Sequence, residues 1–343
     1  MGQHDPEDNP AKRHEPSDDI PRVSLAGAVA NPHDIDVLRS LSREVSAAME
    51  KYGCFIIVNH GVPREVCQDV EQTSKEFFDL PVEVKNEVLA TADDFEGYDA
   101  GGELLYTSEE TEEHLKDTRG QADAKESYQI WPSTSSYPGS TRSGGTKWPR
   151  LPQGFRQKYM AYYREMERLT SLIYQLLAIA LGKEPQYFEE MNEGHLAVLR
   201  LLCYKDNPNV SEGGVRCSVH SDWGPLTLLR QANSDTCGMY LQIVDPLGEW
   251  MDVKTRGDEI LVNTGDMIDY WTNHRWGAIK HRVVQPEGPL TEPRYSFAYF
   301  HAFNPESMAD PRDFDPEAPS RPVNQWDYVV RKKVNSMSAG DAE

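Results

Sequence analysis

The stretch that best predicts the fold is Gly214-Val215-Arg216-Cys217-Ser218-Val219-His220-Ser221-Asp222-Trp223-Gly224. It begins with a β-prone run, after which a histidine and an aspartate stand two residues apart. Because residues i and i+2 of a strand point to the same face, the side chains of His220 and Asp222 are expected to converge. An imidazole nitrogen and a carboxylate oxygen aimed at one point are two of the three ligands in a two-histidine, one-carboxylate metal face. Such a face holds non-haem Fe(II) and leaves positions open for O₂ and a substrate.

A third ligand must come from elsewhere in the chain, and His281 in Ile279-Lys280-His281-Arg282-Val283-Val284 is well placed to supply it. Further on, Arg294 and Ser296 form another i, i+2 pair in a strand-like run, so a guanidinium and a hydroxyl would share one face. Each piece alone is common, because most H-x-D triplets and single histidines are ordinary hydrogen-bonded residues. Their order within one β-rich region favours a site, since strands that close into a barrel would bring them together.

The composition argues against several classes of function. The 343 residues carry 35 Lys and Arg against 56 Asp and Glu, a formal charge of −21. Such a chain lacks the cationic surface that binding to nucleic acid or to an anionic membrane requires, and no apolar run is long enough to span a bilayer. Five cysteines without a CxxC motif, in a chain that does not open with a secretory leader, predict a reduced, cytoplasmic protein. Nothing in the sequence predicts an oligomeric state.

The first part of the chain is predicted to be mainly helical. Residues 1–19 are polar, contain proline and lack periodicity, so a disordered tail is expected there. Within 20–190, hydrophobic periodicity and capping residues predict strands at 20–25 and 54–61 and helices at 34–51, 63–78 and 155–181, with a short helix from Pro81. The stretch 92–145 breaks this pattern, as a lid or an unstructured segment does, apart from a strand-like piece at 125–131.

The second part of the chain is predicted to be a β-structure. Turn residues separate strand-like runs at 196–204, 215–222, 226–230, 239–244, 250–253, 259–263, 267–271, 281–284 and 295–301. Helices followed by many short strands favour an α+β fold, with helices packed on a double-sheet jelly roll at 191–305. The remaining segment, 306–343, is expected to end in a helix at 323–334. The whole is expected to form one compact unit.

In combination these motifs resemble the isopenicillin N synthase-like group of Fe(II)- and 2-oxoglutarate-dependent oxygenases, over about residues 20–303. The similar segments are 53–62 (Gly-Cys-Phe-Ile-Ile-Val-Asn-His-Gly-Val), 220–229 (His-Ser-Asp-Trp-Gly-Pro-Leu-Thr-Leu-Leu), 263–267 (Asn-Thr-Gly-Asp-Met), 281–283 (His-Arg-Val) and 294–296 (Arg-Tyr-Ser). The resemblance implies a distorted double-stranded β-helix, which is a jelly roll with flanking helices. The chain departs from the family pattern at Trp223, where Tyr is frequent, and at Lys205, where Pro is common.

The resemblance also implies roles for individual residues. His220, Asp222 and His281 would be the ligands of Fe(II). Arg294 and Ser296 would hold the distal carboxylate of 2-oxoglutarate, for which the planar guanidinium fork is suited, and Tyr204 would contact the same cosubstrate. The implied reaction uses O₂ to oxidise an unactivated C–H of a small molecule, by hydroxylation, desaturation or cyclisation, and releases succinate and CO₂.

Three other interpretations remain open. A non-haem iron oxidase of the same fold would not use 2-oxoglutarate, and the Arg-x-Ser pair does not exclude it. A catalytically silent binding protein would not bind Fe(II), and a Zn(II) site with similar ligands would hold metal without O₂ chemistry. The identity of the substrate cannot be read from the sequence. Candidate pocket residues are Tyr106, Tyr128, Trp131 and Phe303, for each of which ordinary aromatic packing is an equally good interpretation.

Overall fold

The computed structural model describes residues 20–91, 96–101, 125–131, 147–329 and 331. The strands are β1 Arg22–Ser24, β2 Cys54–Val58, β3 Gly97–Asp99, β4 Glu126–Ile130, β5 Leu196–Tyr204, β6 Val215–His220, β7 Leu226–Gln231, β8 Leu241–Val244, β9 Trp250–Val253, β10 Ile260–Thr264, β11 His281–Val284, β12 Arg294–Ala302, β13 Met308–Ala309 and β14 Val323–Asn324. The helices are α1 Ala26–Ala30, α2 Ile35–Tyr52, α3 Arg64–Phe78, α4 Val82–Lys85, α6 Phe155–Ala180, α7 Glu189–Asn192, α8 Ser234–Cys237 and α9 Asp266–Trp271, with short 3₁₀ turns η1 Asn86–Val88 and η2 Pro311–Asp313.

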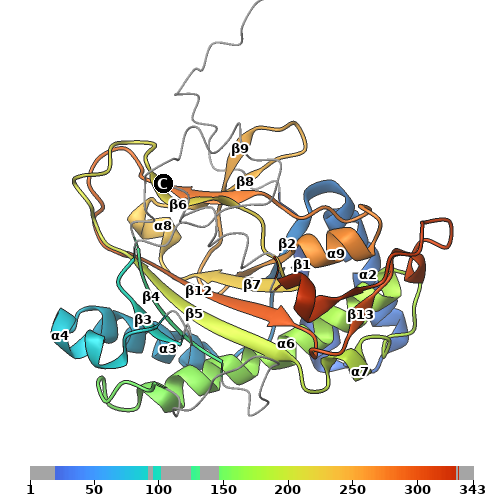
Figure 1. The fold of residues 1–343 in the computed structure, drawn as a ribbon, viewed down its shortest axis with the longest axis horizontal. Helices are drawn as coiled ribbons and strands as arrows, with labels where there is room; N and C mark the ends of the chain where they lie inside the picture. The colour runs from blue at the N-terminus through green and yellow to red at the C-terminus, as the bar shows by residue number, and fades with distance from the viewer. Residues whose placement is uncertain (1–19, 92–95, 102–124, 132–146, 330, 332–343) are drawn as a thin grey trace, which may run out of the picture.

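Two β-sheets form the centre of the molecule. The larger has the order β1-β2-β10-β7-β12-β5-β4-β3, and the smaller has the order β6-β11-β8-β9. Figure 1 shows the smaller sheet on one side of the larger one and the long helix α6 on the other side. The arrangement is the α+β fold with a jelly-roll core that the sequence predicts, and the predicted strands mostly agree with the observed ones to within two residues.

Local sequence explains why the covering helices begin and end where they do. The Asp34 side chain accepts hydrogen bonds from the backbone N–H groups of Asp36 and Val37 at 3.0 and 3.2 Å, which caps the N-terminus of α2. Gly53 ends the same helix in the left-handed conformation, with φ of 66°. In α6, Tyr159 accepts a hydrogen bond from the backbone N–H of Ile130 at 3.1 Å and donates one to the carbonyl of Leu199. These contacts hold α6 against the large sheet.

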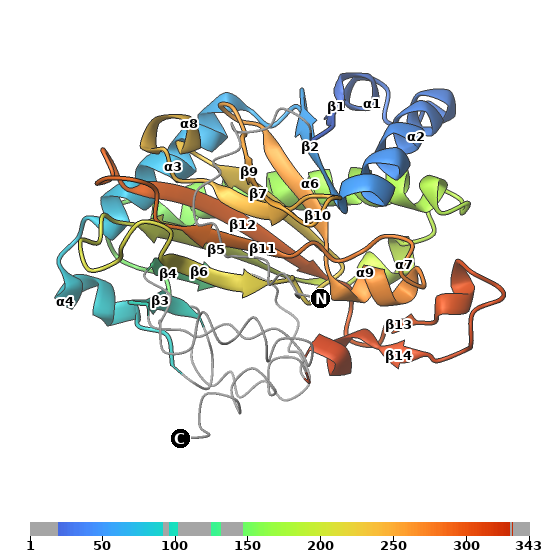
Figure 2. The same cartoon turned by 90° about the horizontal axis from the view of Figure 1, so that it is seen from above.

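Strands from the first part of the chain extend the large sheet at both ends. β2 pairs with β10, so that Cys54 lies opposite Asn263. At the other end β4 pairs with β5, with Ser127 opposite Leu202. Strands from the N-terminal half therefore flank β5 and β12, which carry Tyr204, Arg294 and Ser296, whereas β6 and β11 lie in the smaller sheet, and Figure 2 shows the two halves of the chain sharing the large sheet.

Two predicted elements are wrong. Residues 267–271, predicted as a strand, lie in the helix α9, because a short apolar run does not distinguish a strand from a buried helical turn. Met267, Ile268 and Trp271 are its buried residues, a spacing that fits one face of a helix. The predicted helix at 323–334 begins later: 323–324 is the strand β14, paired with β13, and helical structure starts at 325. The short pair β13–β14 carries no strong alternation and is absent from the sequence prediction.

Several predictions fall on residues outside the described ranges. These are the disordered tail at 1–19 and most of the irregular stretch 92–145, of which the structure describes β3 and β4. Within the described ranges no helix combines the length and the apolar character needed to cross a membrane. All five cysteines are buried, and none of them forms a disulfide.

Candidate active site

Three predicted ligand residues lie together between the two sheets. One ligand atom each from His220, Asp222 and His281 lies within 4.8 Å of the others, and in the described part of the chain this is the only cluster of three such side chains. His220 at the end of β6 and His281 at the start of β11 are direct cross-strand partners, with ring centroids 4.1 Å apart. Asp222 follows two residues after β6, and its Oδ1 lies 3.7 Å from Nε2 of His281. The antiparallel pairing thus brings the two imidazoles and the carboxylate to one point.

Backbone hydrogen bonds set the tautomer of both imidazoles. Nδ1 of His220 lies 2.7 Å from the carbonyl oxygen of Ser218, and Nδ1 of His281 lies 3.1 Å from that of Ile279. Because a carbonyl oxygen only accepts, each Nδ1 must carry the hydrogen, which leaves the Nε2 lone pair for a cation. Burial, aided by the charge of His281, lowers the pKa of His220 to about 4. The ring is therefore neutral near pH 7, as a metal ligand must be.

Two hydrogen bonds hold the carboxylate of Asp222 in place. Asn263 on β10 donates a hydrogen bond from Nδ2 to Oδ2 of Asp222 at 2.7 Å, and the hydroxyl of Thr227 bonds to the same carboxylate. Burial alone would raise the pKa of Asp222, but the nearby His281 and His220 and these two hydrogen bonds hold it below its usual value. The side chain is therefore an anion with Oδ1 available to a cation.

A glycine is required where α9 meets the loop that carries Asp222. A Cβ on Gly265 would lie 2.3 Å from the carbonyl oxygen of Asp222 and 2.5 Å from that of Gly224. The next residue, Asp266, donates its backbone N–H to the Asp222 carbonyl at 2.8 Å. The Asp266 side chain also accepts a hydrogen bond from the Ser221 hydroxyl at 2.6 Å, so the Asn-Thr-Gly-Asp motif supports the loop that carries Asp222 with two side chains and with closely packed backbone.

A second cluster surrounds a buried arginine. Arg294 is 1% exposed, pairs with Tyr204 across β12 and β5, and lies with its guanidinium carbon 4.9 Å from the centre of the tyrosine ring. Its Nη1 donates to Oγ of Ser296 at 3.2 Å and its Nη2 donates to Oε1 of Gln231 at 2.8 Å. Nε is buried and has no hydrogen-bond partner among the described residues. A buried guanidinium with an uncommitted N–H fits a carboxylate ligand such as that of 2-oxoglutarate.

The sequence alone did not indicate Asn263, Thr227 or Gln231 as parts of the site. All three are buried polar residues on strands of the large sheet. Asn263 lies within one of the motifs that carry the resemblance, but no local sequence pattern indicates which residue its amide bonds to. Lys205, one of the two departures from the family pattern, donates to Glu126 and to the Phe78 carbonyl, both at 2.8 Å. It therefore ties β5 to β4 and α3.

The aromatic residues named as pocket candidates are mainly packing residues. The ring of Tyr128 packs against Phe77 and Phe155 with centroids 5.2 and 5.0 Å apart, in the main core. Phe303 stacks on Phe188 at 5.5 Å in the same core. Trp131 is half-buried and donates its backbone N–H to Glu96, and Tyr106 lies outside the described residues.

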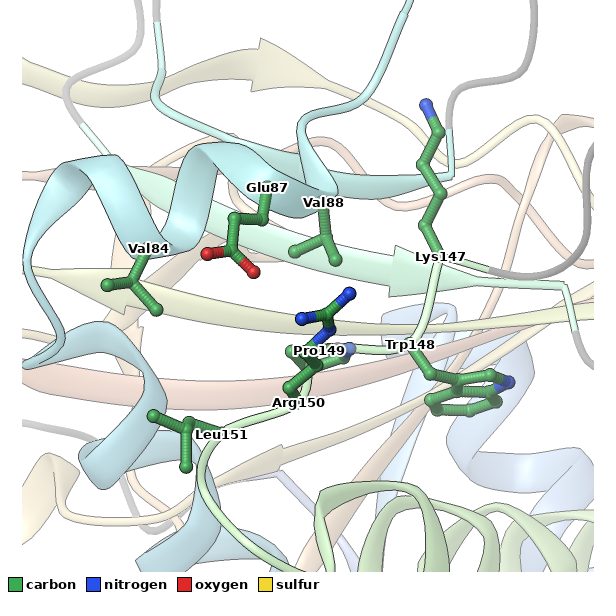
Figure 3. A pocket seen from close by; sticks show the side chains of 8 residues that line it. All are labelled: Val84, Glu87, Val88, Lys147, Trp148, Pro149, Arg150 and Leu151. Atoms are coloured by element: carbon green, nitrogen blue, oxygen red, sulfur yellow. The ribbon is translucent and has the colours of Figure 1, made fainter.

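A pocket of about 550 Å³ lies elsewhere, between the α4–η1 turn and the segment that precedes α6 (Figure 3). It is lined by Val84, Glu87, Val88, Lys147, Trp148, Pro149, Arg150 and Leu151. None of the predicted site residues is among them. The pocket therefore has no part in the clusters around His220 and Arg294.

The chain is similar to known protein families and to individual proteins. Residues 20–150 match the family described as the N-terminal part of non-haem dioxygenases in morphine synthesis, and residues 195–302 match the 2OG-Fe(II) oxygenase superfamily. Among curated relatives, the 2-oxoglutarate-Fe(II) type oxidoreductase hxnY of Emericella nidulans is 30% identical, over 78% of this chain and 75% of that protein. Validamycin A dioxygenase of Streptomyces hygroscopicus subsp. limoneus is 26% identical, over 87% and 82%.

The similarity in three dimensions covers nearly the whole chain. The structure of a full-length Neurospora crassa protein in complex with alpha-KG and thymine has a TM-score of 0.77 and 26% identity, over 92% of this chain and 97% of that chain. A 2OG-Fe(II) oxygenase family protein from Caulobacter crescentus has a TM-score of 0.74 at 20% identity, over 93% and 99%, a likeness of fold. The similarity therefore includes both the N-terminal segment and the jelly roll.

Proposed function

Because this chain belongs to the 2OG-Fe(II) oxygenase superfamily, and is thus an Fe(II)- and 2-oxoglutarate-dependent dioxygenase, we propose that its Fe(II) is held by His220, Asp222 and His281. Arg294 and Ser296 hold the distal carboxylate of 2-oxoglutarate, and Tyr204 contacts the same cosubstrate. The observation that supports the metal assignment most strongly is the convergence of three ligand atoms within 4.8 Å. Both imidazoles also present Nε2, and the carboxylate presents Oδ1.

The protein side chains bind and orient the reactants in this proposal. When bound, Fe(II) supplies the activation of O₂ and the oxidative decarboxylation of 2-oxoglutarate to succinate and CO₂. Arg294 attracts the far end of the cosubstrate, since its guanidinium is buried and one N–H is uncommitted. Apolar side chains between the sheets, among them Leu229, Ile243 and Val283, keep water away from the reacting atoms.

The substrate proposed here is a small molecule with an unactivated C–H that is hydroxylated, desaturated or cyclised. Among the relatives, Validamycin A dioxygenase is named for a small molecule, and the Neurospora crassa protein is solved with the small molecule thymine. The oxidase that does not use 2-oxoglutarate is not favoured, because relatives are named for the cosubstrate and a solved neighbour contains it. The five buried cysteines, none of which is in a disulfide, agree with the proposed cytoplasmic location.

We further propose the following division of the chain: a tail at 1–19, a helical and strand module at 20–190, the catalytic jelly roll at 191–305 and a C-terminal segment at 306–343. The sharing of one sheet by strands on either side of 190–191 supports a single compact unit rather than separable domains.

The proposal is tested by adding Fe(II) and then 2-oxoglutarate without oxygen, while following the weak visible charge-transfer band of the chelate. The band should form with the unchanged protein and should require much more 2-oxoglutarate after Arg294→Ala. Arg282→Ala is a matched control, since Arg282 is likewise a strand arginine that donates to a glutamine, Gln242, and packs on an aromatic ring, that of Trp250. A band whose 2-oxoglutarate dependence is the same in Arg294→Ala would remove Arg294 from its proposed role.

A further inference from the structure

Gln231, the last residue of β7, uses the full hydrogen-bonding capacity of its side chain. The residue is 1% exposed. Its Oε1 accepts from the backbone N–H of Leu241 at 2.9 Å and from Nη2 of Arg294 at 2.8 Å. Its Nε2 donates to the carbonyl of Val253 at 3.0 Å and to Oγ1 of Thr255 at 3.3 Å. Because an amide can accept two and donate two such bonds, none is left for a ligand.

The partners also settle which end of the amide is which. The Leu241 N–H can only donate, and the Val253 carbonyl can only accept. The carbonyl end of Gln231 must therefore face Arg294. A turned amide would place two donors against the guanidinium and against the Leu241 N–H.

The contact with Arg294 fixes the plane of the guanidinium. One terminal nitrogen is held by Ser296 and the other by Gln231, while the ring of Tyr204 lies against the group. Gln231 lies opposite Ser296 in the pairing of β7 with β12, two strands that lie side by side in the large sheet (Figure 2). The guanidinium is thus oriented before a ligand arrives, which lowers the entropy cost of binding.

Gln231 also connects this arginine to the sheet that carries the metal ligands. Leu241 is on β8 and Val253 is on β9, both in the smaller sheet. In the same sheet β8 pairs with β11, with Ile243 opposite His281. One side chain therefore links the arginine of the large sheet to the strand beside a proposed ligand. A cosubstrate that contacts both the metal and Arg294 requires a fixed distance between the metal ligands and the guanidinium.

We propose that Gln231 is a positioning residue that sets the affinity and the selectivity for 2-oxoglutarate by acting through Arg294. The inference rests on the proposed role of Arg294 as the partner of the distal carboxylate. Gln231 itself does not touch the cosubstrate. Its removal should therefore weaken ligands that carry a distal carboxylate and should leave ligands without one unaffected.

The test compares 2-oxoglutarate with 2-oxopentanoate, which has the same chain but no distal carboxylate. Binding of each is measured by calorimetry on Mn(II)-loaded protein without oxygen, so that the readout is independent of turnover. Gln231→Met keeps the length of the side chain and removes its hydrogen bonds. Because a hydrogen bond to a charged group is lost, 2-oxoglutarate affinity should fall about tenfold to a hundredfold, while 2-oxopentanoate affinity stays unchanged.

Controls separate positioning from a merely structural role. Gln242→Met removes a glutamine that likewise joins an arginine, Arg282, to a neighbouring strand through Asp252, away from the cluster around Arg294. It should leave both affinities unchanged. If Gln231→Met does not fold, Gln231→Glu serves instead, because it keeps the acceptor oxygen that faces Arg294 and adds a negative charge that competes with the cosubstrate for Arg294. It too should weaken 2-oxoglutarate alone.

A double-mutant cycle distinguishes failure of this inference from failure of the proposed site. In an Arg294→Ala background, Gln231→Met should cause no further loss of 2-oxoglutarate affinity, because the residue it acts through is absent. An equal loss for both ligands, or no loss for either, would overturn the positioning role of Gln231. If Arg294→Ala itself leaves 2-oxoglutarate affinity unchanged, the proposed cosubstrate site is wrong and the inference falls with it.

Discussion

Replacing Asn263 by leucine should weaken metal binding although none of the three proposed ligands is changed. Asn263 is 3% exposed, and its Nδ2 lies 2.7 Å from Oδ2 of Asp222. A hydrogen bond to an ionised group contributes about 1.5–3 kcal/mol, and leucine is close enough in volume to fill the space without forming it. After the change, Thr227 still bonds to the Asp222 carboxylate, but one of the two hydrogen bonds that orient Oδ1 is lost. Metal affinity should fall about 10–100-fold, as it does when residues that orient metal ligands are removed.

The assay is competition for Fe(II) with a coloured chelator in the absence of oxygen, with thermal unfolding recorded in parallel. The Asn263 bond helps to hold the pKa of Asp222 below its usual value, so its removal raises that pKa. Protons then compete more strongly with the metal, and the difference between variant and unchanged protein should widen as the pH falls. A smaller difference at lower pH would show that the bond does not act on the carboxylate.

Asn233→Leu is the matched control for Asn263→Leu. Asn233 is a buried asparagine that donates to the Pro293 carbonyl and accepts from the Tyr295 N–H, at 2.8 and 2.9 Å, without contacting the proposed ligands. It should lower stability and leave Fe(II) affinity as it was. A folded Asn263→Leu variant with unchanged Fe(II) affinity would refute the orienting role of Asn263.

Three further predictions concern the ligands, the supporting glycine and a buried histidine. His220→Ala or Asp222→Ala should abolish iron binding, measured as metal content after desalting; a variant that keeps its full iron would contradict the ligand assignment. Gly265→Ala should cost about 1–3 kcal/mol of stability in urea melts and weaken Fe(II) binding, because its Cβ would meet the Asp222 and Gly224 carbonyls; equal metal affinity would argue against this support. Burial and the neighbouring His195 lower the pKa of His301, which bonds to Tyr174 and Asn192. As the pH falls, the histidine is protonated in the unfolded chain before it is protonated in the folded protein, so its contribution to stability is complete above about pH 6.5 and is lost below it, by up to about 1.4 kcal/mol per pH unit. In His301→Leu the dependence of unfolding free energy on pH should correspond to the uptake of one proton fewer. An unchanged pH dependence in urea melts between pH 5 and 7 would disprove it.

The sequence predicts most of the fold because most elements have a local signal. Asp34 and Gly53 mark the ends of α2 directly, and turn residues separate the strands of the jelly roll. The helix α9 is missed because five mostly apolar residues carry too little periodicity to separate helix from strand. Elements that depend on pairing alone, such as β3 and β13–β14, have no strong pattern of their own.

The proposed site was only partly predictable for a similar reason. His220 and Asp222 are two residues apart, so strand geometry alone indicates that they converge. The amides of Asn263 and Gln231 reach partners 41 and 63 residues away in sequence. Such contacts depend on the register of the sheets and on which way a buried amide faces, neither of which is encoded near the residue itself.

The direct pairing of His220 with His281 bears on how loops of this protein can diverge. The ladder between β6 and β11, and not the length of the chain between them, fixes the separation of the two imidazoles. The hairpin between β8 and β9 lies within that intervening chain, and Leu247 at its tip is 87% exposed. An insertion there would lengthen the connection while leaving the histidines in register. New loops for new substrates can therefore be acquired between the ligands without rebuilding the metal centre.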